Sequence, residues 1–176
     1  MAGRRRRPLE GFTLNQEQTY LAEAVTLARR NIENGGRPFG AVVVKDGEIV
    51  GRGVNEMLST GDPTSHAELN ALPAAARTLR TPRLEGAAVY ASGQPCPMCL
   101  AAMRMAGITE IAYANSNADA EPFGLSTAAI YAELAKPLAE QAMRFRHVPV
   151  DDTDTTPLYV IWQSGRGTNS RQAKQP

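Results

Sequence analysis

The sequence predicts an α/β protein, a three-layer α/β/α sandwich with a mixed sheet of roughly five strands. Segments with helical periodicity alternate along the chain with short β-branched segments, which is typical of strands joined by crossover helices. One pair of β segments is joined by Asp-Gly, which indicates an antiparallel hairpin in the same sheet. The chain has 176 residues, 43% of them hydrophobic, so one domain can bury a core without disulfides.

The first elements are a helix and a hairpin. Residues 14–33 carry apolar residues at helical spacing, and Thr13 with Gln16 resembles a capping box. Two adjacent glycines at 35–36 predict the end of this helix. Residues 39–55 then contain two β-rich runs around Asp46. The first run is continuously apolar, which favours a strand buried on both faces.

Further elements alternate in the middle of the chain. Residues 61–79 predict a helix that begins near Pro63 and is kinked or broken at Pro73. A strand is expected over 85–92, followed by a helix over 96–107. These motif-bearing helices begin directly after sheet elements, where sites in open α/β sheets gather.

The last third of the chain is less regular. We expect a strand over 108–114, a helix over 128–142 interrupted at Pro137, and a short strand over 145–150. Residues 156–163 are ambiguous, because Thr-Pro is a good helix start whereas the β-branched content favours a strand.

Domain boundaries follow from composition. Residues 1–10 are expected to be a disordered basic arm, residues 11–163 the folded domain, and residues 164–176 a disordered polar tail. The formal net charge of +1 argues against a protein built as a whole to bind nucleic acid, although the arginines at 4–7 leave an RNA-binding arm open. No apolar run has membrane-spanning length, and the basic N-terminus lacks the apolar segment of a secretory signal. We therefore expect a cytoplasmic protein without a membrane partner.

The chain's two cysteines occur in the motif PCPMC, as Cys96 and Cys99. They could pack as small hydrophobic residues, form a redox pair, or bind a metal ion. Pro95 and Pro97 place them at a helix N-terminus, where the dipole stabilises thiolates. His66, at the start of another predicted helix, favours metal binding because a redox pair has no use for a third ligand.

Glu68 follows His66 by two residues, and side chains at this spacing do not share a helix face. Both can reach one ion only if it lies at the end of the helix. Three protein ligands are typical of catalytic zinc sites and four of structural ones. His147, the other histidine, would close the site, although a lone histidine in a β segment is more often a surface or core residue. Glu68 itself could be only an exposed helix glutamate.

Beside an open zinc site, Glu68 would serve as general base and acid. A bound zinc ion lowers the pKa of a water molecule from ~15.7 toward ~7. The carboxylate can then move a proton to a ring nitrogen and to a leaving amine, which gives a carbonyl and ammonia.

The sequence HAE at 66–68, together with PCPMC at 95–99, resembles the signature of the cytidine deaminase-like zinc deaminases. The resemblance extends from about residue 14 to residue 163. The stretch ADAEPFGLSTAAIYAELAKP, at 118–137, is most similar to bacterial guanine deaminases and plant guanosine deaminases. Transfer RNA adenosine deaminases share the zinc motifs but are less similar over this stretch.

The resemblance implies roles for eight residues of this chain. It implies one Zn²⁺ per chain, bound by His66, Cys96 and Cys99. It implies that Glu68 shuttles protons. It also implies these substrate contacts: a hydrogen bond from Asn55, a pocket wall at Phe39, the backbone of Ala67, and an acid at Asp119. Without the resemblance, Asn55 would be interpreted as a turn former and Phe39 as a core aromatic.

The chain departs from the family pattern at several positions. Gln94 stands before PCPMC, where the family usually has glutamate, and Met103, Arg104 and Met105 replace aromatic residues of the guanine deaminases. A roomier site would follow if these residues lined it. In the guanine deaminases, aromatic residues of a C-terminal helix close the site. That helix is hard to match in this chain, where only Tyr159 and Trp162 could serve.

We therefore predict a zinc-dependent hydrolase that acts on C–N bonds of cyclic amidines and deaminates a nucleobase or nucleoside of purine metabolism, guanine type first. The alternatives are a tRNA adenosine deaminase, a cytosine or cytidine deaminase, and a non-catalytic structural zinc module. The resemblance also implies a homodimer, because family members are commonly dimers, some with exchanged C-terminal segments. Besides a second copy of the chain, the expected binding partner is a small molecule, a nucleobase or nucleoside.

Overall fold

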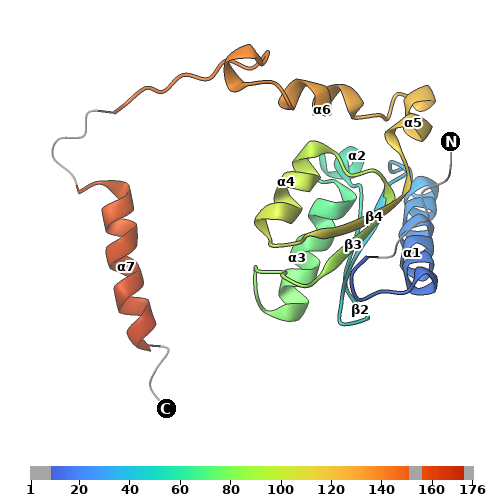
Figure 1. Cartoon of the computed structure of the whole chain (residues 1–176), viewed down its shortest axis with the longest axis horizontal. Helices are drawn as coiled ribbons and strands as arrows, with labels where there is room; N and C mark the ends of the chain where they lie inside the picture. The colour runs from blue at the N-terminus through green and yellow to red at the C-terminus, as the bar shows by residue number, and fades with distance from the viewer. Residues whose placement is uncertain (1–8, 151–155, 173–176) are drawn as a thin grey trace. The chain divides into compact units, whose positions relative to one another are not determined.

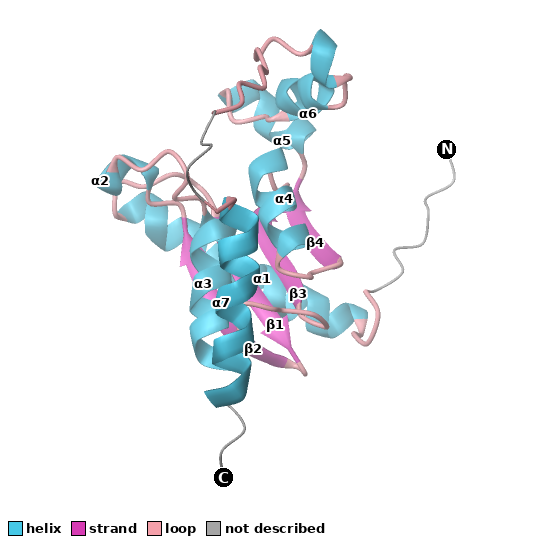
Figure 2. Ribbon diagram, turned by 90° about the vertical axis from the view of Figure 1, so that its left-hand side faces the viewer, coloured by secondary structure: helices cyan, strands magenta, loops and turns pink. Residues whose placement is uncertain are grey.

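The sheet at the centre of the fold has four strands, in the order β2-β1-β3-β4. It is seen in a computed structural model that describes residues 9–150 and 156–172. The strands are β1 (Gly40–Lys45), β2 (Glu48–Val54), β3 (Ala88–Gly93) and β4 (Glu110–Asn115). β1 pairs antiparallel with β2 and β3, whereas β3 pairs parallel with β4, so the sheet is mixed as predicted. Figure 2 shows these strands side by side.

Helices cover both faces of the sheet (Figure 1). α1 (Leu14–Glu33) packs on one face against β1 and β3, and α3 (Ala67–Leu79) packs on the other against β2 and β1. α4 (Pro97–Met105) contacts α3 on that second face. The predicted α/β/α sandwich is confirmed.

The alternation of side chains along β1 shows why this strand is apolar at every position. Val42 and Val44 belong to the hydrophobic cluster on the α1 side, and Ala41 and Val43 belong to the cluster on the α3 side. All four are fully buried. A strand covered on both faces has no solvent-facing position, as was expected for this run.

Local signals in the sequence place α1 and the hairpin correctly. Thr13 and Gln16 form the predicted capping box at the start of α1. Asp46 and Gly47 turn the chain between β1 and β2, and both have positive φ, 51° and 81°. This is the backbone of a type I′ hairpin turn, for which Asp-Gly is a favoured pair.

The start of α3 lies later than predicted. The helix begins at Ala67 and not near Pro63, and His66 is its N-cap residue with extended φ and ψ. A separate short helix, α2 (Met57–Thr60), precedes it. A kink or an early break was predicted at Pro73, and the break is wrong because α3 continues through this residue.

The sheet has four strands where about five were predicted. Residues 145–150 have no regular structure, so the predicted strand there is wrong. They fall in the second of two compact units, residues 1–141 and residues 142–176. The regular element described in the second unit is α7 (Leu158–Gln172), which settles the ambiguous 156–163 segment as helical and extends into the predicted polar tail. The predicted basic arm lies mostly outside the described residues.

The first unit ends in short helices after β4. They are α5 (Asn117–Ala120), the 3₁₀ turn η1 (Glu121–Phe123), α6 (Ala128–Leu134) and the 3₁₀ turn η2 (Leu138–Glu140). The helical prediction for 128–142 is confirmed as far as the interruption at Pro137, which is the N-cap of η2. No helix in the described parts of the chain is long and apolar enough to cross a membrane.

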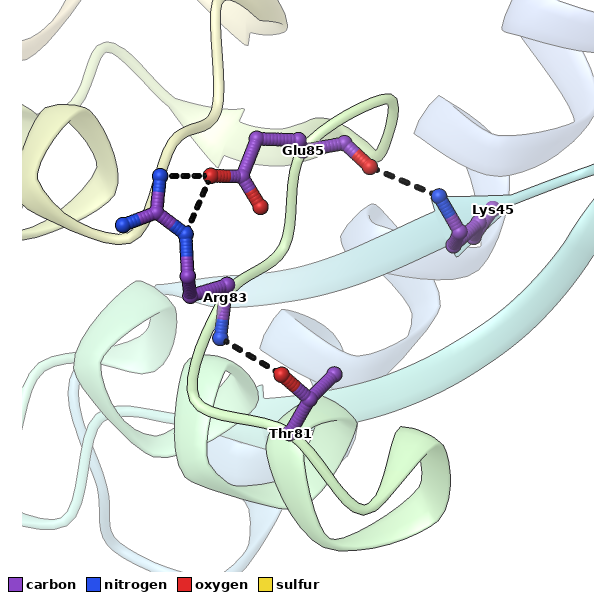
Figure 3. A network of polar contacts seen from close by, with 4 residues as sticks. All are labelled: Lys45, Thr81, Arg83 and Glu85. Carbon is purple, nitrogen blue, oxygen red and sulfur yellow. Dashed lines mark hydrogen bonds and ion pairs between the residues drawn. The ribbon is translucent and has the colours of Figure 1, made fainter. Parts of the chain in front are cut away.

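Polar contacts tie the connection between α3 and β3 to the hairpin (Figure 3). Arg83 forms an ion pair with Glu85, and its backbone N–H donates to Thr81 Oγ1 at 3.2 Å. Lys45 Nζ donates to the carbonyl oxygen of Glu85 at 2.6 Å. The ion pair is solvent-exposed and therefore contributes little to stability.

α3 approaches β2 so closely that only glycine fits at position 53. A Cβ atom there would lie 2.2 Å from the carbonyl oxygen of Ala67 and 2.5 Å from the amide nitrogen of Ala71. Both atoms are backbone of α3, so they cannot move without moving the helix. The contact therefore fixes the first turn of α3, and with it His66, against the sheet.

We expect Gly53→Ala to destabilise the protein by about 1–3 kcal/mol, as overpacking usually does, and to weaken metal binding through the displaced His66. Thermal unfolding and metal titration measure the two effects. Gly165→Ala is the control, because nothing lies within 4 Å of that added Cβ. Unchanged unfolding and metal affinity in Gly53→Ala would contradict the constraint.

Candidate active site

Two helix N-termini bring the predicted metal ligands together. His66 is the N-cap of α3 and Cys96 is the N-cap of α4, and both have extended backbone before the helix begins. Pro97 occupies the first position of α4, as predicted from its fixed φ. Cys99 follows in the first turn of the same helix. The side chains can fan around one point because each lies at the end of its helix.

The loop before α3 is held by Asn70. Its Nδ2 donates to the carbonyl oxygen of Val54 at 2.8 Å, to Ser65 Oγ at 2.9 Å and to Glu56 Oε2 at 3.1 Å. The backbone N–H of Glu56 in turn donates to the carbonyl oxygen of Ser65 at 2.9 Å. These bonds fix the residue that precedes His66 to the end of β2.

The three ligand atoms form a nearly equilateral triangle. His66 Nδ1 lies 3.5 Å from Cys96 Sγ and 3.5 Å from Cys99 Sγ, and the two sulfur atoms are 3.5 Å apart. A tetrahedral zinc ion, with bonds of ~2.3 Å to sulfur and ~2.1 Å to nitrogen, separates its ligand atoms by about 3.6–3.8 Å. The residues therefore fit zinc and present one face of a tetrahedron.

The electrostatics of the cysteine pair suit metal binding. The hydrogen bond from Cys99 lowers the pKa of Cys96 to about 4, against the opposing effect of burial. The pKa of Cys99 is raised, first by this same contact and then by burial. One thiolate is thus present near neutral pH before any ion binds, and a metal cation would favour the second.

The pKa of His66 is raised, chiefly by its hydrogen bond to Cys96. The positive charge of Arg37 opposes this rise, because the guanidinium lies close enough to act on the ring. Among the described residues, His66, Cys96 and Cys99 are the cluster that could hold a metal. His147 belongs to the second unit.

Glu68 lies beside the triangle and outside it. Its Oε2 is 3.4 Å from Cys99 Sγ, and the side chain is only 7% exposed. No cation among the described residues forms an ion pair with it. Burial raises its pKa above the ordinary value for glutamate. A buried carboxyl group with a raised pKa holds its proton more firmly than an exposed glutamate, as a group that takes up and releases protons requires.

A small cavity of about 60 Å³ opens beside Glu68. Nine residues line it: Arg37, Phe39, Asn55, His66, Glu68, Gln94, Cys96, Leu125 and Thr127. A second cavity of about 200 Å³ shares Phe39, Gln94 and Leu125 with the first. The two cavities are therefore neighbours, with these three side chains between them.

Asn55 and Phe39, both predicted substrate contacts, line the small cavity. Asn55 is 2% exposed; its carbonyl oxygen accepts from Asn31 Nδ2 at 2.8 Å, and its Oδ1 accepts from the N–H of Met57 at 3.2 Å. Phe39 packs on Gly93, where a Cβ would lie 2.9 Å from the ring. Ala67 is buried at the first position of α3, next to His66.

Asp119 lies outside the small cavity. Its carboxylate accepts from the backbone N–H and the hydroxyl of Ser116, both at 2.7 Å, and so completes a capping box at the start of α5. It lines the larger neighbouring cavity. The Ser-x-x-Asp spacing at 116–119 is the sequence signal for this capping role.

The methionines and arginine considered as replacements for aromatics do not line either cavity. Met103 is fully buried in the core on the α3 side, and Met105 is 89% exposed. Their size therefore does not set the volume of the site.

The sequence interpretation missed Arg37, Leu125 and Thr127, which line the small cavity. Arg37 stands two residues before Phe39, which is the one local signal that pointed toward it.

The 116–127 segment is connected to the cavity wall through Gln94. The backbone N–H of Asn117 donates to Gln94 Oε1 at 3.1 Å. Asn117 Oδ1 accepts from the N–H of Thr127 at 3.0 Å and from its hydroxyl at 3.2 Å. Tyr131 adds a bond from its hydroxyl to the carbonyl oxygen of Pro95 at 2.5 Å. These contacts hold the loop against the start of α4.

Comparison with known proteins finds a family and several relatives. Residues 14–115 match the family described as the cytidine and deoxycytidylate deaminase zinc-binding region. A guanine deaminase of Bacillus subtilis (strain 168) is 40% identical over 84% of this chain and 94% of that protein. A tRNA-specific adenosine deaminase of Aquifex aeolicus (strain VF5) is 31% identical over 77% of this chain and 87% of that protein.

A solved structure is similar over most of the chain. The X-ray structure of guanine deaminase from Bacillus subtilis superposes with a TM-score of 0.73 at 37% sequence identity, covering 85% of this chain and 93% of that one.

We expect the purified chain to bind one zinc ion and Cys99→Ser to lose most of it, because removing a thiolate leaves two ligands. Metal content by mass spectrometry after dialysis checks both. His147→Ala is the matched control and should keep its zinc. Loss of zinc from His147→Ala would contradict the open three-ligand site.

Proposed function

The chain belongs to the family of cytidine and deoxycytidylate deaminases with a zinc-binding region, and from this premise we propose that its substrate is a guanine-type base or nucleoside. The family and the relatives make it a zinc-dependent hydrolytic deaminase. The observation that supports the catalytic part of the proposal is a buried carboxyl group, Glu68. It lies directly beside three residues that could hold one metal ion. The similarity to a guanine deaminase over most of both chains supports the choice of substrate.

The residues divide the reaction between them. His66, Cys96 and Cys99 would hold a zinc ion. A zinc ion bound there would act as a Lewis acid that activates water. Glu68 takes a proton from the attacking water and delivers protons to the ring nitrogen and to the departing amino group. The new C–O bond becomes the carbonyl, the C–N bond breaks, and the amine leaves as ammonia. Burial of Glu68 keeps bulk water away from these transfers.

We assign the substrate contacts as follows. Asn55 hydrogen-bonds the base, Phe39 forms one wall, and the backbone of Ala67 contacts the ring at the start of α3. Asp119 lines the larger cavity and not the small one. It would therefore contact only a part of the substrate that reaches the larger cavity, such as a ribosyl group.

The alternatives differ in the observation that favours them. Similarity to a tRNA-specific adenosine deaminase favours an RNA substrate, and the arginines at 4–7 would be its phosphate contacts. Cytosine or cytidine remains an alternative within the same chemistry. A structural zinc module is disfavoured by Glu68, because such a site needs no carboxyl group beside it.

Ammonia release from guanine, guanosine, adenine, cytosine, cytidine and a tRNA anticodon stem tests the substrate. We expect guanine or guanosine to have the highest kcat/KM, and Glu68→Ala to lower it by ~10²–10⁴-fold while keeping zinc. Asp119→Ala should affect guanosine more than guanine, and Asn55→Ala should affect both. Near-native turnover by Glu68→Ala would refute the mechanism. Highest activity on cytidine, adenine or tRNA would refute the substrate assignment.

We further propose a cytoplasmic homodimer. Both cysteines are free and buried, as suits a reducing compartment. The second unit exposes a run of large apolar side chains in α7, at Leu158–Trp162. Exposed apolar surface of this kind is typical of an interaction surface. Light scattering at micromolar concentration should give twice the 18.9 kDa chain mass, and a monomer mass would refute the dimer.

A further inference from the structure

The side-chain amide oxygens on the walls of the small cavity already accept hydrogen bonds. Asn55 Oδ1 accepts from Met57, and Gln94 Oε1 accepts from Asn117. The Thr127 hydroxyl donates its proton to Asn117 Oδ1, so it can offer a ligand only a weak neutral acceptor. The only carboxyl group that lines this cavity is Glu68, which is used for proton transfer.

The donors of the same walls are free. Because the amide oxygens of Asn55 and Gln94 face backbone N–H groups, their other amide atoms must be the NH₂ groups. Neither NH₂ group has an acceptor among the described residues, although Asn55 is only 2% exposed. Apart from the Glu68 carboxyl group and the Thr127 oxygen, a substrate in this cavity therefore meets donors, and its edge must supply acceptors to them.

Arg37 adds the strongest of these donors. Its guanidinium has no hydrogen bond or ion pair with any described residue, although the side chain is partly buried. Its backbone is fixed, since its carbonyl oxygen accepts from Asn31 Nδ2 at 2.8 Å and from the N–H of Phe39 at 2.8 Å. Arg37 lines the same cavity as His66 and Glu68. A half-buried arginine without a partner, held beside a reaction site, indicates that the partner is a ligand.

We propose that Arg37 determines substrate specificity by donating two hydrogen bonds to adjacent acceptors on the ring edge of a 6-oxopurine. This inference rests on the proposed deaminase function and names the feature of the substrate that is recognised. O6 and N7 of guanine form such an acceptor pair, and the planar guanidinium fork matches it. Adenine presents an amino group in place of O6, which would put a donor against a donor.

The role requires arginine and not merely a positive charge. A lysine at position 37 would keep the charge but could not bind both acceptors in one plane. Gln94 and Asn55 would supply further donors to the same edge, so the cavity as a whole excludes rings with donor-rich edges. A site built to hydrogen-bond a polar group rejects an analogue that lacks it more strongly than an apolar pocket rejects a change of volume.

The test compares guanine with 7-deazaguanine, which keeps O6 and the 2-amino group but lacks the N7 acceptor. Dissociation constants are measured by calorimetry on zinc-loaded Glu68→Gln protein, in which the bases are not consumed. We expect 7-deazaguanine to bind about 10- to 100-fold more weakly than guanine. Adding Arg37→Met should reduce this ratio to about one, and Arg37→Lys should reduce it partly. Arg29→Met, an exposed arginine on α1, is the matched control and should leave the ratio unchanged.

The outcomes separate this inference from the proposed function. A ratio that stays the same with and without Arg37 overturns the role of Arg37, as does equal binding of both bases when Arg37 is present. If Arg37→Met loses zinc or unfolds, the ratio in Arg37→Lys decides in the same way. Ammonia release by the wild-type protein is measured separately. No release from guanine, together with an intact binding ratio that depends on Arg37, would refute the deaminase substrate and leave the recognition by Arg37 standing.

Discussion

The close approach of α3 to β2 at Gly53 is the constraint on which the rest of the site depends. Without a side chain at this position, the backbone of β2 meets the backbone of α3 at Ala67 and Ala71. The first turn of α3 is thereby fixed relative to the sheet, and His66 is fixed as its N-cap. Because β3 leads directly into α4 in the same sheet, the cysteines reach the same point. The equal 3.5 Å separations follow from two helix starts held by one sheet.

Burial then gives this arrangement its chemistry. Glu68 is largely shielded from solvent and has no cationic partner among the described residues, so desolvation raises its pKa. Such a group is unfavourable for folding when charged, and a structural metal site would gain nothing from it. A carboxyl group retained in this environment is instead suited to hold a proton and pass it on. The burial of Glu68 beside the three ligands thus supports the proposed reaction site over a structural zinc site.

Sequence reasoning succeeded where the signal is local and failed where it is tertiary. The capping box at Thr13, the Asp-Gly turn and the ligand set could be predicted, because each depends on residues that are neighbours in the chain or on a spacing known for zinc. Leu125 and Thr127 could not be predicted, because a loop brings them to the cavity from outside the motifs. The 145–150 segment has strand-like composition, yet strands also need a hydrogen-bonded neighbour, which composition does not reveal.

Asp119 and Arg37 show how similarity and structure complement each other. Similarity to guanine deaminases pointed to Asp119 as an acid on the substrate side, and in the structure one oxygen of its carboxylate caps α5 while the residue lines the larger cavity. Asp119 does not line the small cavity, where Arg37 is the charged donor that we propose for the ligand. The polarity of the substrate edge is therefore set by which wall groups already have internal partners. Two proteins with the same zinc motifs can in this way select different rings without any change in their shared chemistry.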